Sequence, residues 1–239
     1  MRRSQTLAAA LAAVLAAVLA VLAAVLVACN QDTVWVPRLH GEYLEPTSPD
    51  NLVANLAEAY TWQETDGYTP ILAPEFVFRF QPGYAQDLGL TSWTRGEDST
   101  ATAGLFAAPE VGDDIRISLP HGPAEDAGAP FAPGVQRIRI NPTFLEVDIV
   151  GGDMAGTTFR IDGDIQDLFF RRGNAAAGED TTRWFLIEWR DLPAPFAAAG
   201  PVTDLAATET VSWGRIKALY SGLLDAPSRN HMPLQGVAP

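Results

Sequence analysis

One carboxylate in the chain stands among bulky apolar side chains. Glu188 lies in a stretch, 183–191, that reads as a β-strand because aromatic and branched residues run through it. Residues two apart share a face of a strand, so one face holds Phe185, Ile187 and Trp189, and the other holds Trp184, Leu186 and Glu188. Both faces are largely apolar. A carboxylate there must be paired, or loss of hydration penalises its charged form.

The partner that Glu188 requires indicates the chemistry it could do. Arg79 is the one cation among the phenylalanines of an earlier strand, and Tyr60 and Tyr68 come from expected helices. A glutamate paired with one of them could orient a ligand or act as a general base. Glu188, Tyr60 and Arg79 are therefore the candidate catalytic residues. The alternative is an exposed glutamate that pairs with Arg190 or Arg183.

Other titratable residues point to no metal and no cofactor. Asp162, Asp164 and Asp167 resemble the start of a calcium loop, but Gly173 stands where that loop needs its twelfth-position glutamate. A solvated strand face explains these acids better. The three histidines, at positions 40, 121 and 231, fall in expected loops and tails, and no zinc or phosphate-binding pattern is present.

The only cysteine follows an apolar segment at the N-terminus. Arg2 and Arg3 precede an uncharged run of Ala, Val and Leu from Leu7 to Val27, which is typical of a secretion signal. A plain transmembrane anchor is the alternative, because such a run can span a bilayer. The run ends Leu-Val-Ala-Cys, which resembles the lipobox of bacterial lipoproteins. The resemblance implies cleavage before Cys29, lipidation of its thiol, and a place in the bacterial cell envelope, at the outer membrane if the host has one.

The charge of the chain argues against nucleic acid as a partner. The formal net charge is −13, and it becomes −15 without residues 1–28, because these carry Arg2 and Arg3 and no acid. A domain this acidic is repelled by phosphate backbones. We expect a signal peptide at 1–28, a tether at 29–47, one globular domain at 48–220 and a loose tail at 221–239.

The elements that must position Glu188 form a β-meander preceded by helices. Alternating apolar residues predict strands over Val135–Val150, Thr157–Arg172 and Arg183–Asp191. Ser48-Pro49 predicts the start of a helix, Asp66 a second short helix, and Thr94 with Glu97 a capping box that opens a third. Residues 76–80 form a strand, and a loop leads on to Trp93. A last helix has Trp213 on its packed face.

This order resembles the nuclear-transport-factor-two-like, or cystatin-like cone, superfamily. The residues that carry the resemblance are 66–78, which look like its second helix and first strand, and 183–191, which look like a late strand. The 212–220 segment is similar to the end of lipoprotein members. The resemblance implies an α+β fold in which a curved antiparallel sheet wraps around three N-terminal helices and leaves a cone between them. Isomerases of the family place an acid near the end of the first strand, but here that position reads Arg79-Phe80-Gln81. Dehydratases of the family use inward histidines, but none of the three histidines here lies on an expected strand or helix.

Six aromatic residues belong to elements that surround the cone in this family. They line an apolar pocket or fill the core: Tyr60, Trp62, Tyr68, Trp93, Trp184 and Trp189. We expect an exported, lipid-anchored domain with a binding or structural role that could hold a small apolar ligand. Two alternatives stay open, an acid–base enzyme such as an isomerase, dehydratase or cyclase, and a module that forms a homodimer through its open sheet face.

Overall fold

The computed structural model describes residues 41–193 and 208–221. The expected signal peptide, Cys29 and nearly all of the expected tail lie outside these residues. No helix in the described part is both long and apolar enough to cross a membrane.

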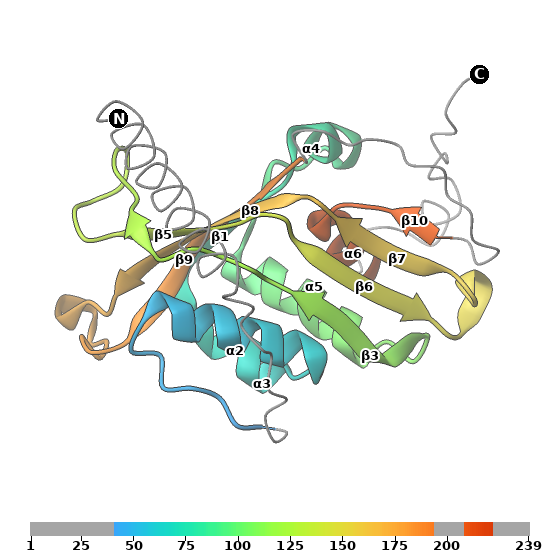
Figure 1. Ribbon diagram of the computed structural model, residues 1–239, viewed down its shortest axis with the longest axis horizontal. Coiled ribbons are helices and arrows are strands. Elements are labelled where there is room, and N and C mark those ends of the chain that lie inside the picture. Colours follow the sequence, from blue (N-terminus) through green and yellow to red (C-terminus); the bar gives the residue numbers. More distant parts are fainter. Residues whose placement is uncertain (1–40, 194–207, 222–239) are drawn as a thin grey trace, which may run out of the picture. The chain divides into compact units, whose positions relative to one another are not determined.

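Two sheets form the frame of the domain (Figure 1). The larger has the strand order β2-β1-β9-β8-β5-β4, and the smaller has the order β10-β7-β6-β3. Most neighbouring strands are antiparallel, but β1 pairs with β9, and β10 with β7, in parallel. The strands are β1 (Leu72–Arg79), β2 (Ser92–Thr94), β3 (Val111–Ser118), β4 (Glu125–Asp126), β5 (Gln136–Ile140), β6 (Phe144–Ile149), β7 (Thr158–Asp162), β8 (Ile165–Arg172), β9 (Trp184–Leu192) and β10 (Thr208–Thr210).

One long, bent hairpin joins the two sheets. The predicted strand 135–150 is divided into β5 and β6, and the predicted strand 157–172 into β7 and β8, while β9 matches its prediction. At the bend, the Thr143 amide donates to the Asp164 carbonyl (2.8 Å) and the Gly163 amide donates to the Thr143 carbonyl (3.1 Å). Gly163 has φ +92°, a conformation that favours glycine, so the strand turns there. The alternation of apolar and polar residues, which predicted one continuous strand on each side, gives no sign of this bend.

The helices are α2 (Pro49–Thr61), α3 (Thr65–Tyr68), α4 (Pro82–Leu88), α5 (Arg95–Ala107) and α6 (Trp213–Tyr220). The predicted starts of α2 and α5 are confirmed. The Ser48 hydroxyl accepts from the Asn51 amide at 3.2 Å, and Thr94 and Glu97 form the capping box. Short 3-10 turns occupy 69–71, 152–154 and 175–177.

Three local predictions are corrected. The loop expected before Trp93 contains α4, which starts at Pro82 and is followed by the C-cap Gly89 in the left-handed conformation (φ +65°). The second helix starts at Thr65, so Asp66 lies in its first turn and does not cap it. Part of the expected tether contacts the domain, because the Leu44 amide and carbonyl both bond to the Asn55 side chain at 2.7 Å.

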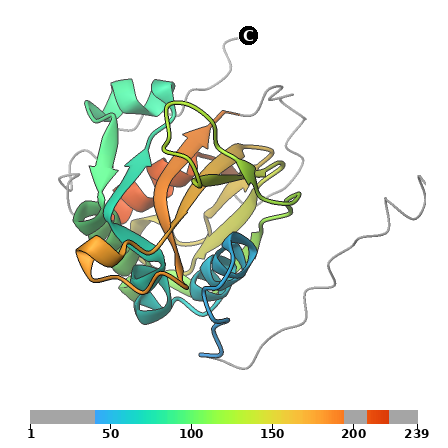
Figure 2. The ribbon, with the colours of Figure 1, turned by 90° about the vertical axis from the view of Figure 1, so that its left-hand side faces the viewer.

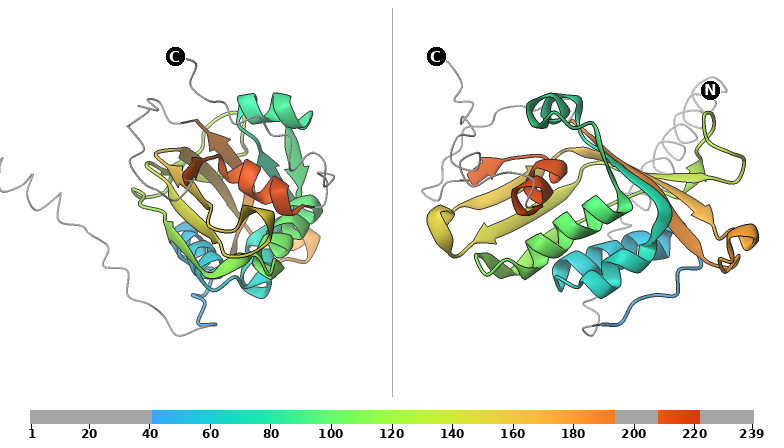
Figure 3. Two further views of the ribbon diagram at one scale, coloured as in Figure 1. Left: turned by 90° about the vertical axis from the view of Figure 1, so that its right-hand side faces the viewer. Right: turned by 180° about the vertical axis from the view of Figure 1, so that it is seen from behind.

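The helices α2, α3 and α5 pack beneath the curved sheet, and α6 lies beside α5 (Figures 1 and 3). Figure 2 shows how strongly the larger sheet twists across its strands. Buried apolar side chains from both sheets and from α2, α3, α5 and α6 form one continuous core. The expected α+β architecture, an antiparallel-rich curved sheet around helices, is confirmed.

Candidate functional site

The interior of the cone contains a buried ion pair. Lys217, on α6, is 0 % exposed, and its ammonium Nζ donates to the Asp98 carboxylate Oδ1 on α5 at 2.7 Å. Nζ also donates to the Tyr68 hydroxyl at 2.9 Å, and that hydroxyl donates to the other Asp98 oxygen. One cation, one carboxylate and one hydroxyl therefore form a closed triangle of hydrogen bonds.

Three aromatic rings surround the same ammonium. Nζ lies 4.7 Å from the ring centroid of Trp189, 4.9 Å from that of Phe78 and 5.1 Å from that of Tyr68. Within about 6 Å, an aromatic face attracts a cation through its negative electrostatic potential. We call Asp98, Tyr68, Phe78 and Trp189 the ammonium cage.

Burial dominates the electrostatics of the cage. Loss of hydration lowers the pKa of Lys217, and the Asp98 charge opposes that change. Burial also raises the pKa of the Tyr68 hydroxyl well above its usual value, and the nearby Asp98 charge adds to the increase. Tyr68 thus keeps its proton and donates a hydrogen bond to the Asp98 carboxylate. A buried pair of this kind costs several kcal/mol to break by removing one partner.

A second buried carboxylate holds the first turn of α6. Asp191 Oδ2 accepts from the Gly214 amide at 3.1 Å, and Oδ1 accepts from the Gln166 and Gln81 side-chain amides at 2.9 and 3.1 Å. Burial raises the pKa of Asp191 to about 6, and the charge of Asp164 acts in the same direction. The positive end of the helix dipole favours an acid at this position.

Trp213 completes the attachment of α6. Its side chain is 0 % exposed, and the indole Nε1 donates to the Tyr60 hydroxyl at 2.9 Å. The ring also packs against Tyr60 and Trp189, with centroid separations of 5.0 and 4.7 Å. The predicted packing of Trp213 on the domain is confirmed.

Two glycines allow α6 to approach this closely. A Cβ on Gly214 would lie 2.4 Å from a ring carbon of Phe80, and a Cβ on Gly104 of α5 would lie 2.2 Å from the Tyr220 carbonyl oxygen. Both distances are far inside van der Waals contact. The helix therefore fills the cone against β1 on one side and α5 on the other.

The aromatic residues predicted to surround the cone separate into two groups. Tyr60, Tyr68, Trp93 and Trp189 are at most 1 % exposed and belong to the packed core. Trp62 is 37 % exposed and donates to the Glu58 carboxylate at 2.7 Å.

Trp184, the sixth, is also buried in the core, but the Arg172 guanidinium covers its ring at 5.0 Å. Two open hollows with volumes of about 560 and 110 Å³ are lined in part by Tyr43. None of the six aromatic residues lines either hollow. Five of the six rings are buried among protein atoms.

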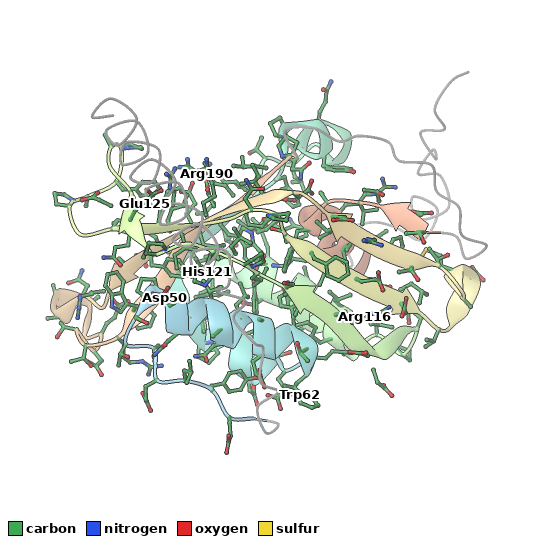
Figure 4. The ribbon with its side chains drawn as sticks, viewed as in Figure 1. Asp50, Trp62, Arg116, His121, Glu125 and Arg190 are labelled. Atoms are coloured by element: carbon green, nitrogen blue, oxygen red, sulfur yellow. The ribbon has the colours of Figure 1, made fainter. Side chains whose placement is uncertain are left out.

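Glu188 lies on the opposite face of the sheet from the cage. In the register of β1 and β9, Glu188 pairs with Val77 and Trp189 pairs with Phe78, so the two neighbours point to opposite sides. Arg79, one of the three expected partners, donates to Glu188 from Nε at 2.8 Å, and Arg190 donates to the same oxygen. Figure 4 shows Arg190 on the side of the sheet away from α2. Tyr60 and Tyr68 lie inside and do not reach Glu188.

The outer face around Glu188 is rich in arginine. Arg139 and Arg137 follow on β5, and Arg139 makes two 2.7 Å bonds to Asp167, which is only 3 % exposed. The expectation that Asp167 lies on a solvated face was therefore wrong. Phe131 stacks on Phe169 at 4.3 Å over the same face. We call Arg79, Arg137, Arg139 and Arg190, with Phe131 and Phe169, the arginine face.

Sequence reasoning missed Asp98, Asp191 and Lys217, although the sequence carried signals for two of them. Lys217 is the only lysine in the chain, and it stands four residues after Trp213, on the same side of a helix. Asp98 stands three and seven residues before Ala101 and Leu105, on the buried side of α5. Asp191 stood at the expected end of a strand and gave no signal.

Comparison with known proteins shows no family for this chain. No family model and no curated protein matches the sequence. Solved structures that resemble the chain include an NTF2-like protein from Rhodospirillum rubrum (13 % identity, TM-score 0.40), with 61 % of this chain and 98 % of that chain covered. A cystatin-like protein from Nostoc punctiforme has 11 % identity and a TM-score of 0.37 over 61 % of this chain and 88 % of its own.

A third structure, a protein from Catenulispora acidiphila with a ketosteroid isomerase-like fold, has 15 % identity and a TM-score of 0.35. It covers 62 % of this chain and 88 % of its own. The cone fold predicted from the sequence is the fold that these descriptions name. The likeness is one of fold alone and indicates no ligand or reaction for this chain.

Proposed function

We propose that the chain is an exported, lipid-anchored binding domain that meets its partner at its surface and not in its interior. The observation that carries this proposal is the filled cone. Trp213 and Lys217 of α6 occupy the interior with no exposed surface, and both buried carboxylates there, Asp98 and Asp191, already bond to α6. A small apolar ligand would have to displace this helix before it could enter.

The arginine face is the surface that we assign to a partner, and a second copy of the chain is the partner that we propose. Four arginines and three carboxylates (Glu125, Glu188 and Asp167) alternate there, which gives a net charge of about +1 on a chain of −13. Two such faces related by a two-fold axis can oppose unlike charges. Elsewhere, the acidic surfaces of two copies repel each other.

Native mass spectrometry of the domain purified from its host tests both parts of the proposal. We expect a dimer with no retained small molecule. Arg79→Glu should shift the equilibrium toward monomer, whereas Arg116→Glu, on β3 of the other sheet and equally exposed at 50 %, should leave it unchanged. A stoichiometric small molecule in the spectrum would contradict the surface-binding proposal. A monomer at about 100 µM, well above the Kd of ordinary specific dimers, would contradict the assigned partner.

The acid–base alternative has one observation in its favour, the contact between the Asp98 carboxylate and the Tyr68 hydroxyl in the interior. Such a pair can move a proton to or from a bound substrate. In this structure Lys217 takes the place that a substrate would need. Glu188 does not serve this alternative, because two guanidinium groups engage it on the outer face.

A further inference from the structure

The only lysine of the chain is fully buried. The other fifteen of the sixteen lysines and arginines are arginines, and among those that lie in residues 41–193 and 208–221 none is fully buried, whereas Lys217 is. An ammonium group is compact and directs three donors from one atom, whereas a guanidinium is a wide planar fork. The cage places two oxygen acceptors and the rings of Phe78 and Trp189 around one point, which is the environment of a compact cation.

The frame of the domain supplies all of the cage, and α6 supplies only the cation. Tyr68 comes from α3, Asp98 from α5, Phe78 from β1 and Trp189 from β9. The strands and the other helices therefore supply the anionic and aromatic surroundings of the ammonium. The cation is carried by a separate helix of eight residues.

We propose that the interior of the cone is a binding site for a primary alkylammonium group, and that Lys217 occupies it as an internal ligand. The carboxylate and hydroxyl hold the NH₃⁺ group by charge-assisted hydrogen bonds, and the rings hold it by cation–π attraction. An added alkylammonium ion would place its alkyl chain where the methylenes of Lys217 lie in this structure. This site is independent of the arginine face and of any partner that binds there.

The Lys217→Ala variant tests the proposal by chemical rescue. It removes three methylenes and the amine, so n-propylammonium matches the missing atoms. We expect this variant to melt lower and to bind propylammonium saturably, with at least about tenfold preference over 1-propanol, because a hydrogen bond to a charged group contributes that much. The unchanged protein should not bind it. The double variant Lys217→Ala, Asp98→Asn should lose the preference.

Equal binding of propylammonium and 1-propanol, or no saturable binding by a folded Lys217→Ala variant, overturns the proposal. If the alanine variant does not fold, nuclear magnetic resonance of the unmodified protein decides. Its single lysine gives one set of ε-methylene signals, and the rings of Trp189 and Phe78, centred 4.7 and 4.9 Å from Nζ, should shift these signals away from the free-lysine position. Signals at the position of a free lysine would overturn the assignment. Lys217→Arg, which keeps the charge but not the compact shape, should destabilise the domain.

Discussion

Replacing Trp213 by alanine tests how firmly α6 is held. The indole is fully buried between Tyr60 and Trp189 and loses both ring contacts and its 2.9 Å hydrogen bond in the variant. Truncation of a buried Trp costs about 3–5 kcal/mol. For a domain of this size each kcal/mol lowers Tm by about 2–4 °C, so we expect a decrease of roughly 6–20 °C in thermal unfolding followed by circular dichroism.

Trp62→Ala is the matched control, because the chemical change is the same at a position that is 37 % exposed. We expect it to lower Tm less than Trp213→Ala does, because the Trp62 ring is partly exposed, although its hydrogen bond to the buried Glu58 carboxylate is lost. If the two variants lower Tm equally, or if Trp213→Ala leaves Tm within about 2 °C of the unchanged protein, α6 does not contribute to the core and the reasoning fails.

Three further changes address the same account. Gly214→Ala should destabilise the domain by several kcal/mol in denaturant unfolding, because its Cβ would meet a ring carbon at 2.4 Å, whereas Gly96→Ala on α5, with open space around it, should be neutral or stabilising. Asp191 has a folded-state pKa raised to about 6, so the folded state holds the proton better, and the free energy of unfolding should fall as pH rises from about 4 to about 6. Asp191→Asn should remove this component of the pH dependence, and an unchanged slope would refute the assignment. Cys29→Ser should leave an unprocessed precursor that takes up no labelled fatty acid, and mature-sized protein released from the membrane would contradict the lipoprotein proposal.

The secondary structure was largely predictable because its signals are local. Ser48 with Pro49, and Thr94 with Glu97, satisfy the first amides of their helices whatever surrounds them. The run of aromatic and branched residues along 184–192 likewise predicts a single strand without reference to other parts of the chain. Helix α4 was missed although Pro82 and Gly89 mark its ends, because its short sequence shows no apolar period.

The candidate site was less predictable because it depends on which distant segments meet. Glu188 drew attention by its apolar neighbours in the sequence, but only the register with Val77 shows that it lies on the outer face. The pair of Asp98 and Lys217 joins residues 119 apart in the sequence. Each of the two residues lies on the apolar side of its helix, but neither helical pattern shows which residue it will contact. Long-range pairing of this kind requires the folded chain.

The reactivity of the single lysine tests the central claim, that α6 fills the cone, most directly. An amine-reactive reagent applied to the native protein can modify Lys217 only when α6 leaves its site, and the chain has no other side-chain amine. Peptide mass spectrometry would follow the modification with time, with the urea-denatured protein as the reference. We expect native Lys217 to react at least about a hundredfold more slowly, because exposure requires local unfolding of packed core. Equal rates in native and denatured protein would show that the helix is free and the cone open.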